Sequence, residues 1–236
     1  MAPLICGVTV NLLPSTTSTS RPLSICRMSL TGALPPLVIA LCAMVAALCP
    51  AAGDILQFDR ARILSGQWYR LLTGHLTHFT ASHLAWDLGV FIGLGLIAGA
   101  IDGRGTAVTL ALAAVAIPLG VLQFQPALQT YRGLSGLDSA LFVFLVCRQL
   151  WVAEDGLGTT GLGLAWAPFG CLVVFGAKVV FECVTGRTLF VSGAGTFTAV
   201  PLAHAVGGAC GAAVGLIWQN KWILAVLPAN RGVTSP

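Results

Sequence analysis

Residues 201–215, PLAHAVGGACGAAVG, decide how this chain folds, because they combine an apolar run with one histidine and a row of glycines. Counted from His204, glycines follow at three, four, seven and eleven residues, namely Gly207, Gly208, Gly211 and Gly215. In a helix these spacings place the imidazole and the glycines on one face. Faces of small residues let membrane helices approach one another closely. The stretch therefore predicts a helix that packs tightly against a second helix.

The partner that fits this face begins in residues 132–142, RGLSGLDSALF. Its apolar run opens with small residues, namely Gly133, Ser135, Gly136, Ser139 and Ala140. A serine held between glycines leaves room for a substrate carbonyl and for a general base beside the hydroxyl. If the two small faces meet, the Ser135 hydroxyl comes within reach of a His204 nitrogen, as in other serine nucleophile systems.

The composition is that of a membrane protein. Of the 236 residues, 56% are hydrophobic and 8% are charged, against about 25% charged residues in an ordinary soluble domain. This number of charged side chains is too small to cover the surface of a soluble domain. The surface must therefore face lipid. A net charge of +4 on scattered arginines offers no basic stripe for nucleic acid. The eight cysteines lack CxxC and Cys/His spacing, so we expect neither a metal nor a cofactor.

Six apolar runs are long enough to cross a bilayer, which takes about 20 residues each as a helix. They lie at residues 33–51, 82–101, 106–124, 135–152, 162–184 and 199–218. We therefore expect an all-α polytopic membrane protein built as a six-helix bundle. The expected divisions are a disordered cytoplasmic tail at 1–32, a membrane domain at 33–228 with an interfacial loop at about 52–81, and a C-terminal tail at 229–236. Met28 is an alternative start within that first tail.

The distribution of lysines and arginines beside these runs predicts the orientation. With both ends in the cytoplasm, six of these residues lie inside and five outside. The small excess favours this orientation, which puts Ser135 and His204 toward the outer face of the membrane.

Ionisable side chains in membrane helices are costly, so each one is a candidate for function. The second run opens in HFTASHLAWD, residues 78–87, which sets His83 and Asp87 four residues apart on one helix face. Donors here could stabilise the oxyanion that forms when a serine attacks a peptide carbonyl, at about 3 to 4 kcal/mol per donor. Lys178 and Glu182 are also four residues apart, and we expect them to neutralise one another as a structural pair.

Four motifs together resemble the core of the rhomboid intramembrane serine proteases. They are GQWYRLLT at 66–73, HFTASHLAWD at 78–87, GLSG at 133–136 and AHAVGGACG at 203–211. Each motif is weak alone, but the four occur in the family's order on the expected helices. The resemblance implies a six-helix bundle and a Ser/His dyad without a third acid, with Ser135 as nucleophile and His204 as general base.

The same resemblance assigns supporting roles. It implies an oxyanion hole made by His83 and the backbone N–H of Ser135, with His78 at the mouth of the pocket and Gly133 and Gly136 around the nucleophile. Trp68 and Arg70 would belong to a structural loop in the outer leaflet, and Gly207 and Gly211 to the helix contact. Substrates would be transmembrane proteins, cut in or near a helix that unwinds easily.

Two positions depart from the family pattern. Asp87 stands where rhomboids commonly have Asn, and an ionised carboxylate accepts hydrogen bonds instead of donating them. We expect Asp87 to orient His83, which leaves fewer oxyanion donors. Ser139 stands where a tyrosine often packs on the catalytic imidazole. Asp138, three residues after the nucleophile, is a candidate to support His204, or else pairs with Arg132 or faces water.

The sequence around YRGLSG also resembles the rhombosortases, a bacterial branch whose substrates carry a C-terminal membrane anchor. This resemblance suggests the bacterial inner membrane as the location. Two other functions remain open. One is an inactive rhomboid-fold protein that binds membrane clients, although such relatives usually lack a dyad member. The other is a small proton-coupled transporter, which would spread polar residues along a path through the membrane.

Overall fold

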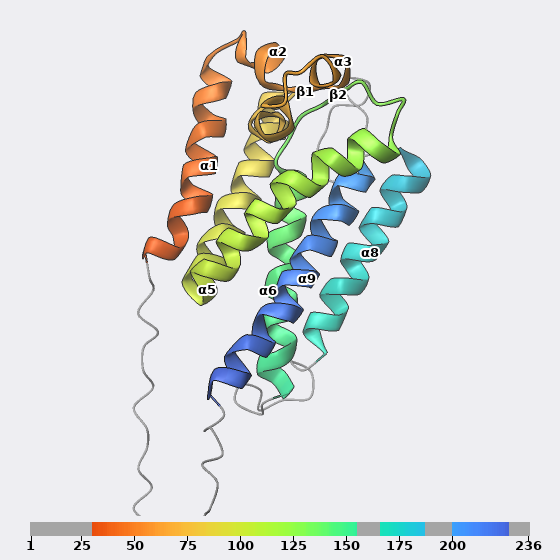
Figure 1. Cartoon of the computed structure of the whole chain (residues 1–236). Coiled ribbons are helices and arrows are strands. Elements are labelled where there is room, and N and C mark those ends of the chain that lie inside the picture. The colour runs from red at the N-terminus through yellow and green to blue at the C-terminus, as the bar shows by residue number, and fades with distance from the viewer. Residues whose placement is uncertain (1–29, 155–165, 187–199, 227–236) are drawn as a thin grey trace, which may run out of the picture.

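The computed structural model describes residues 30–154, 166–186 and 200–226, without the side chains of residues 30, 151–154 and 218–226, and it is mostly helical. Its long helices are α1 (Leu30–Leu48), α5 (Ala81–Phe124), α6 (Ser135–Glu154), α8 (Ala167–Thr185) and α9 (Pro201–Val226) (Figure 1). Among the described residues, α1, α5 and α8 are the three helices long and apolar enough to cross a membrane. The predicted tails at 1–32 and 229–236 fall almost wholly outside the described residues.

Helix α5 consists of two helices that reverse direction at Asp102, as Figure 1 shows in yellow and yellow-green. Asp102 has non-helical backbone angles, φ −153° and ψ 88°. Its side chain accepts a hydrogen bond from the backbone N–H of Gly105 at 2.8 Å, and its carbonyl accepts one from the Thr106 hydroxyl at 2.7 Å. An aspartate in this place caps a new helix start. The two apolar runs at 82–101 and 106–124 thus form two antiparallel helices, as the sequence predicted.

Short elements join α1 to α5 at one end of the bundle (top of Figure 1). They are α2 (Ala52–Leu56), β1 (Phe58–Asp59), α3 (Arg60–Leu64), α4 (Arg70–Thr73) and the 3-10 turn η1 (Gly74–Leu76). Strand β1 pairs antiparallel with β2 (Thr130–Tyr131), Phe58 opposite Tyr131. The predicted loop at 52–81 is therefore an ordered layer that is hydrogen-bonded to the segment just before Ser135.

Arg60 fastens this layer to the end of α5. Its guanidinium donates to the carbonyls of Val121, Leu122 and Gln125 at 3.0, 2.9 and 2.8 Å. The last carbonyls of a helix have no partner within the helix and favour a positive charge. The contact therefore stabilises both the helix end and the loop layer above it.

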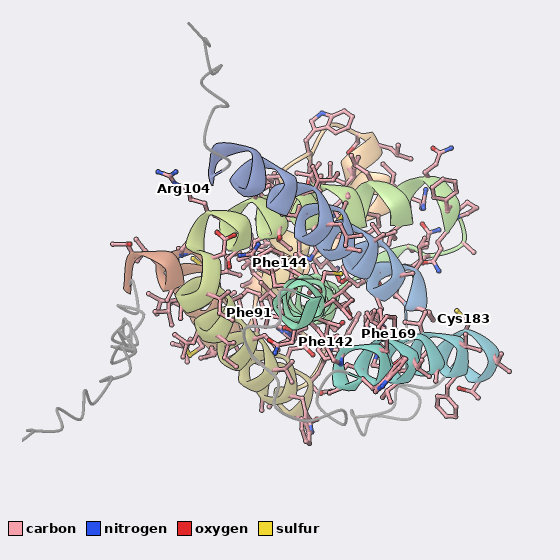
Figure 2. All side chains as sticks on the ribbon, turned by 90° about the horizontal axis from the view of Figure 1, so that it is seen from below. Phe91, Arg104, Phe142, Phe144, Phe169 and Cys183 are labelled. Carbon is pink, nitrogen blue, oxygen red and sulfur yellow. The ribbon has the colours of Figure 1, made fainter. Side chains whose placement is uncertain are left out.

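Helix α6 runs through the middle of the bundle, with α5, α8 and α9 around it, as the end-on view in Figure 2 shows. Its side chains Leu137, Leu141 and Phe144 are fully buried, and Phe91 of α5 packs in the same core. By contrast, the outer faces of α1 and α8 expose large apolar side chains, such as Val173 and Val184. Exposed apolar faces of this extent indicate contact with lipid or with a partner.

The predicted contact between the glycine face and the small face is confirmed. A Cβ atom at Gly207 would overlap the carbonyl oxygen of Gly136, and one at Gly211 would overlap the carbonyl oxygen of Ala140. Helices α6 and α9 therefore touch backbone to backbone along this line. Gly208 lies off the line, because a Cβ there would meet the Phe175 ring of α8 at 2.9 Å.

Candidate functional site

Ser135 is the first residue of α6, and the residues before it explain its position. Gly133 has φ +129°, a backbone conformation that a glycine adopts without strain. The backbone N–H of Leu134 donates to Asp87 Oδ2 at 2.9 Å. The N–H groups of Leu137 and Asp138 donate to the Leu134 carbonyl at 2.7 and 3.0 Å, which closes the first helical turn. The serine thus stands at a fixed helix start.

The two predicted dyad residues are in contact, because the Ser135 hydroxyl lies 3.0 Å from Nε2 of His204. On the other side of the ring, Nδ1 lies 2.7 Å from Oε2 of Glu182. Both His204 and Glu182 are buried, Glu182 with 2% of its surface exposed. The structure therefore arranges serine, imidazole and carboxylate in one line across α6, α9 and α8.

The neighbours of His204 fix which ring nitrogen carries the proton. The ammonium of Lys178 lies 2.8 and 2.9 Å from the two Glu182 oxygens and 3.1 Å from Nδ1. If Nδ1 had no proton, its lone pair would face the lone pairs of Oε2 at 2.7 Å. A carboxylate only accepts hydrogen bonds and an ammonium only donates them. Glu182 Oε2 is the nearer of the two to Nδ1, at 2.7 Å against 3.1 Å for Lys178, and the ammonium has the Glu182 oxygens as closer acceptors, so we assign Nδ1–H as the donor to Glu182. Nε2 then presents its lone pair to the Ser135 hydroxyl, the tautomer that a general base needs.

Glu182 is the site residue that the sequence reasoning assigned to another role. The rhomboid resemblance implies no third acid, and the four-residue spacing explained Glu182 fully as the partner of Lys178. That pair forms, but the same carboxylate also binds His204 from 22 residues away. The sequence did contain a signal for this contact. Glu182 is an acid in an apolar span, and His204, on another span, was a possible second partner for it.

Asp138 has neither of the partners that the sequence suggested. The described contacts join it to neither His204 nor Arg132, and it is buried instead of facing water. Its Oδ1 has no hydrogen-bond partner among the described residues. Arg132 instead binds Asp54 Oδ1 and Gln57 Oε1, each at 2.9 Å. The geometry therefore gives the third position beside His204 to Glu182.

A second polar cluster lies beside Gly133. Asp87 Oδ2 is 3.1 Å from Nε2 of His78 and 3.3 Å from Nε2 of His83. A Cβ at Gly133 would come within 3.0 Å of the His83 nitrogen and 3.1 Å of the Asp87 oxygen. Asp87 contacts His83 as expected. The contact occupies Nε2 of His83, and the family resemblance implies that His83 helps to form the oxyanion hole.

Two further buried groups, which the sequence analysis did not single out, support the loop at Gly133. The Tyr131 hydroxyl donates to the Gly133 carbonyl at 3.3 Å, and His75 Nε2–H donates to the Ala114 carbonyl at 3.1 Å. Burial raises the pKa of Tyr131, and the nearby Asp87 and Asp138 charges raise it further. Burial lowers the pKa of His75. Both side chains therefore stay neutral, and each can donate its hydrogen bond to a backbone carbonyl.

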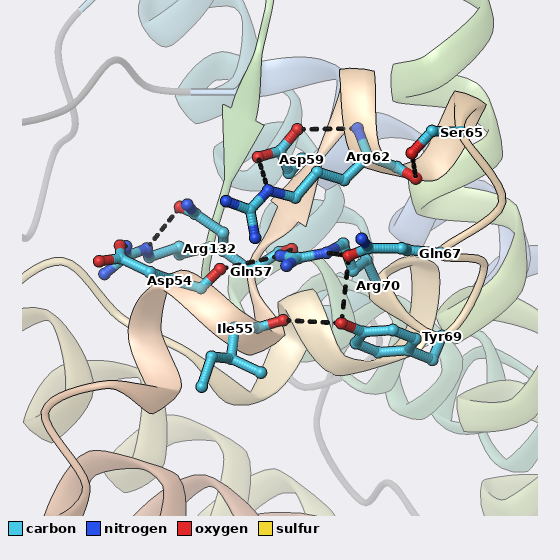
Figure 3. A network of polar contacts seen from close by, with 10 residues as sticks. All are labelled: Asp54, Ile55, Gln57, Asp59, Arg62, Ser65, Gln67, Tyr69, Arg70 and Arg132. Atoms are coloured by element: carbon cyan, nitrogen blue, oxygen red, sulfur yellow. Dashed lines mark hydrogen bonds and ion pairs between the residues drawn. The ribbon is translucent and has the colours of Figure 1, made fainter.

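The predicted structural loop is held by Arg70, whose side chain is 1% exposed. Its guanidinium donates to the carbonyls of Asp54 and Gln57 at 2.9 and 3.0 Å and to Gln67 Oε1 at 2.7 Å (Figure 3). Arg132 joins the same network through Asp54 and Gln57. The loop is thus tied to the segment that leads into Ser135, while Trp68 remains exposed.

No protein-family model matches this chain, and no curated protein matches it significantly. The geometry of the two clusters around residues 133–135 therefore carries the functional argument.

Proposed function

We propose that this chain is an intramembrane serine endopeptidase of the rhomboid kind, which hydrolyses peptide bonds in or near transmembrane segments of membrane-anchored proteins. The observation that carries the proposal is the 3.0 Å contact between the Ser135 hydroxyl and Nε2 of His204, with Glu182 2.7 Å behind Nδ1. A hydroxyl, a base and a residue that orients the base are the parts of an activated nucleophile.

The reaction follows from this line of three groups. The Ser135 oxygen attacks the carbonyl carbon of the scissile peptide bond, and His204 Nε2 takes the hydroxyl proton. The C–N bond breaks, and the imidazolium gives that proton to the leaving amine. A water molecule then attacks the acyl-serine ester with His204 again as base, which releases the new carboxyl end. Glu182 holds the ring and stabilises its charged form in both halves of the reaction.

The oxyanion of each tetrahedral intermediate needs donors at the start of α6. The backbone N–H of Ser135 belongs to the first helical turn, whose N–H groups have no intrahelical partner. Nε2 of His83 faces Asp87 Oδ2 at 3.3 Å. In this proposal the Ser135 N–H donates directly, and His83 must turn from Asp87 before it can add a second hydrogen bond.

We propose that the chain crosses the membrane six times, which is more than the three helices that are long and apolar enough by themselves. The two halves of α5 count as two, and α1, α6, α8 and α9 supply the rest, which matches the six apolar runs of the sequence. We place both chain ends in the cytoplasm of a bacterium and the site toward the outer face of its inner membrane. Following the rhombosortase resemblance, we propose that the substrates carry a C-terminal membrane anchor. The partners of the chain would then be these substrates and the membrane lipid.

Labelling with a serine-directed fluorophosphonate tests the proposal without a known substrate. The full chain in detergent is expected to label, and both Ser135→Ala and His204→Ala are expected to abolish the label and the cleavage of a co-expressed membrane substrate. Ser139→Ala is the matched control, because that hydroxyl donates to the Ser135 carbonyl at 2.9 Å and has no described contact with His204. Cleavage that persists in Ser135→Ala contradicts the proposal.

The inactive alternative gives a different result in the same experiment. An inactive client-binding protein would retain membrane clients equally with and without the Ser135 hydroxyl, and it would not label. Co-purification of clients from the two variants therefore separates binding from hydrolysis.

A further inference from the structure

We propose that His78, His83 and Asp87 form a zinc-binding site beside the start of α6. The two imidazole nitrogens and the carboxylate oxygen all lie within 4.8 Å of one another. Two histidines and one carboxylate are a set of protein ligands that zinc uses in sites with an open fourth position. The three ligands are different residues from Ser135, His204 and Glu182.

Two of the three distances between the ligand atoms suit a tetrahedral ion, and the third, between the histidine nitrogens, is within 4.8 Å. Bonds of about 2.0 to 2.1 Å from zinc to nitrogen and oxygen imply ligand-to-ligand distances of about 3.3 Å in a tetrahedron. In the structure, Nε2 of His78 and Nε2 of His83 lie 3.1 and 3.3 Å from Asp87 Oδ2. Zinc can therefore take the place of the protons that lie between these atoms, and each neutral imidazole then carries its one proton on Nδ1 instead of Nε2.

The chain holds the three ligands in place before any ion binds. His83 and Asp87 are four residues apart on the first turns of α5, so they share a face. Thr80 caps that helix by accepting a hydrogen bond from the His83 backbone N–H at 3.1 Å. The side chains of His78, His83 and Asp87 are only 3%, 6% and 6% exposed. Buried ligands with fixed positions lose little freedom when an ion binds.

Leu134 and Gly133 complete the surroundings of the proposed ion. The Leu134 N–H donates to Asp87 Oδ2 at 2.9 Å, and such a hydrogen bond to a ligand oxygen orients it toward a metal. Gly133 has no side chain, and a Cβ there would lie 3.0 Å from the His83 nitrogen. The glycine thus leaves the space beside the ligand atoms open on the side of Ser135, where a water can take the fourth position.

Asp87 is the residue that makes this cluster a metal site. With an amide in its place, the same geometry would offer a neutral oxygen and an N–H donor, which suits an oxyanion. The carboxylate supplies the negative charge that a divalent cation requires. If the proposed peptidase function holds, zinc here would occupy the space beside the nucleophile and inhibit hydrolysis reversibly.

Metal titration of the purified, chelator-treated full chain in detergent tests the site directly. We expect one equivalent of Zn²⁺ to bind, and Co²⁺ to give the visible absorption of a tetrahedral site with nitrogen and oxygen ligands. Among the described residues, the exposed cysteines Cys42, Cys49, Cys171 and Cys183 are competing ligands. A cobalt spectrum with thiolate charge-transfer bands would therefore overturn the proposal.

Variants decide between this cluster and the buried His204. His78→Ala and Asp87→Asn are expected to weaken zinc binding by about tenfold or more, and the asparagine variant preserves shape if the alanine variant fails to fold. His204→Ala, which removes the histidine beside Glu182, is expected to bind zinc as tightly as the wild type. Unchanged affinity in both His78→Ala and Asp87→Asn, or lost binding in His204→Ala alone, would overturn the site.

Labelling of Ser135 tests whether zinc also inhibits the proposed peptidase. Added zinc should stop fluorophosphonate labelling of Ser135 and a chelator should restore it, while Asp87→Asn should require about tenfold more zinc. Zinc binding in the Ser135→Ala variant tests the site even if the chain proves to hydrolyse nothing, so failure of one proposal is distinguishable from failure of the other. Labelling that stays unchanged at saturating zinc would overturn the inhibition.

Discussion

The carboxylate of Glu182 changes what His204, the proposed general base, needs from its surroundings. An imidazole that works with a serine alone must hold its tautomer by packing, whereas here Nδ1 donates to a buried carboxylate at 2.7 Å. Lys178 balances the charge of that carboxylate from the next helical turn, at 2.8 Å. In the proposed function, the arrangement combines a serine nucleophile in a bundle of apolar helices with the acid of a triad.

Replacing Glu182 with Gln should lower turnover by about 10²-fold to 10⁴-fold, because an amide can present its N–H to Nδ1 and favour the wrong tautomer. We expect the loss in kcat with little change in KM, which a purely structural role for Glu182 would not produce. Steady-state cleavage of a membrane substrate measures both constants. Lys178→Gln is the matched control, since it removes the ion pair but keeps Glu182 on His204, and its effect should be smaller. Equal losses in the two variants would argue against orientation by Glu182.

Gly133 carries both a positive φ and a close approach to the second cluster. Gly133→Ala should destabilise the protein by about 1 to 3 kcal/mol, because φ is +129° and the new Cβ would lie 3.1 Å from Asp87 Oδ2. Thermal unfolding in detergent measures the change. Gly89→Ala is the control, since a Cβ there meets nothing within 4 Å in a helix, and it should be neutral or slightly stabilising. A neutral Gly133→Ala variant would contradict the assigned backbone conformation.

The contact between α6 and α9 sets the distance between serine and histidine, because each helix carries one of them and the two backbones touch. Gly207→Ala should push the helices apart, since its Cβ would overlap the Gly136 carbonyl oxygen, and should cost about 1 to 3 kcal/mol of stability as overpacking. Fluorophosphonate labelling should fall together with the unfolding temperature. Gly176→Ala on α8, where a Cβ has open space, should leave both unchanged. Normal labelling in Gly207→Ala would show that the site tolerates a wider separation.

The helices and their main contact follow from sequence periodicity, and the rest depends on helix rotation. The runs at 82–101 and 106–124 predict the two halves of α5, because charge and glycine separate them around Asp102. The glycine spacing after His204 predicts the contact with α6, and so brings Ser135 to His204. Glu182 was not predicted, because only the rotation of α8 decides whether its carboxylate faces Lys178 alone or His204 as well. The short elements of residues 52–76 depend on hydrogen bonds to distant carbonyls, which no local pattern reveals.

The loop layer meets the long helices at one end of the bundle (Figure 1). It holds buried polar side chains such as Arg70 and Thr77, whereas α1 and α8 expose large apolar side chains. His75 lies at the junction, since its ring joins η1 to the second half of α5 through the Ala114 carbonyl. A neutral imidazole is part of this junction, because burial lowers its pKa below the ordinary value of 6.5.

The stability of the whole fold should therefore fall in mild acid. The folded state holds His75 neutral, so its contribution is complete above pH 6.5 and is lost as the pH falls below that value through the lowered pKa of the folded state. Unfolding temperatures measured from about pH 8 to about pH 5 should decline more steeply in the wild type than in His75→Gln. The glutamine can still donate to Ala114 but cannot gain a charge. Parallel curves for the two proteins would contradict a neutral buried His75.

The backbone contact between α6 and α9 also limits how this protein can diverge. No residue larger than glycine fits at 207 or 211 while the Gly136 and Ala140 carbonyls stay in place. A descendant that gains a methyl group there must shift its neighbouring helix, and that shift would carry Ser135 away from His204. Natural variants that keep a serine at 135 and a histidine at 204 are therefore expected to keep both glycines, whereas lineages that do not need the contact between these two side chains can lose them.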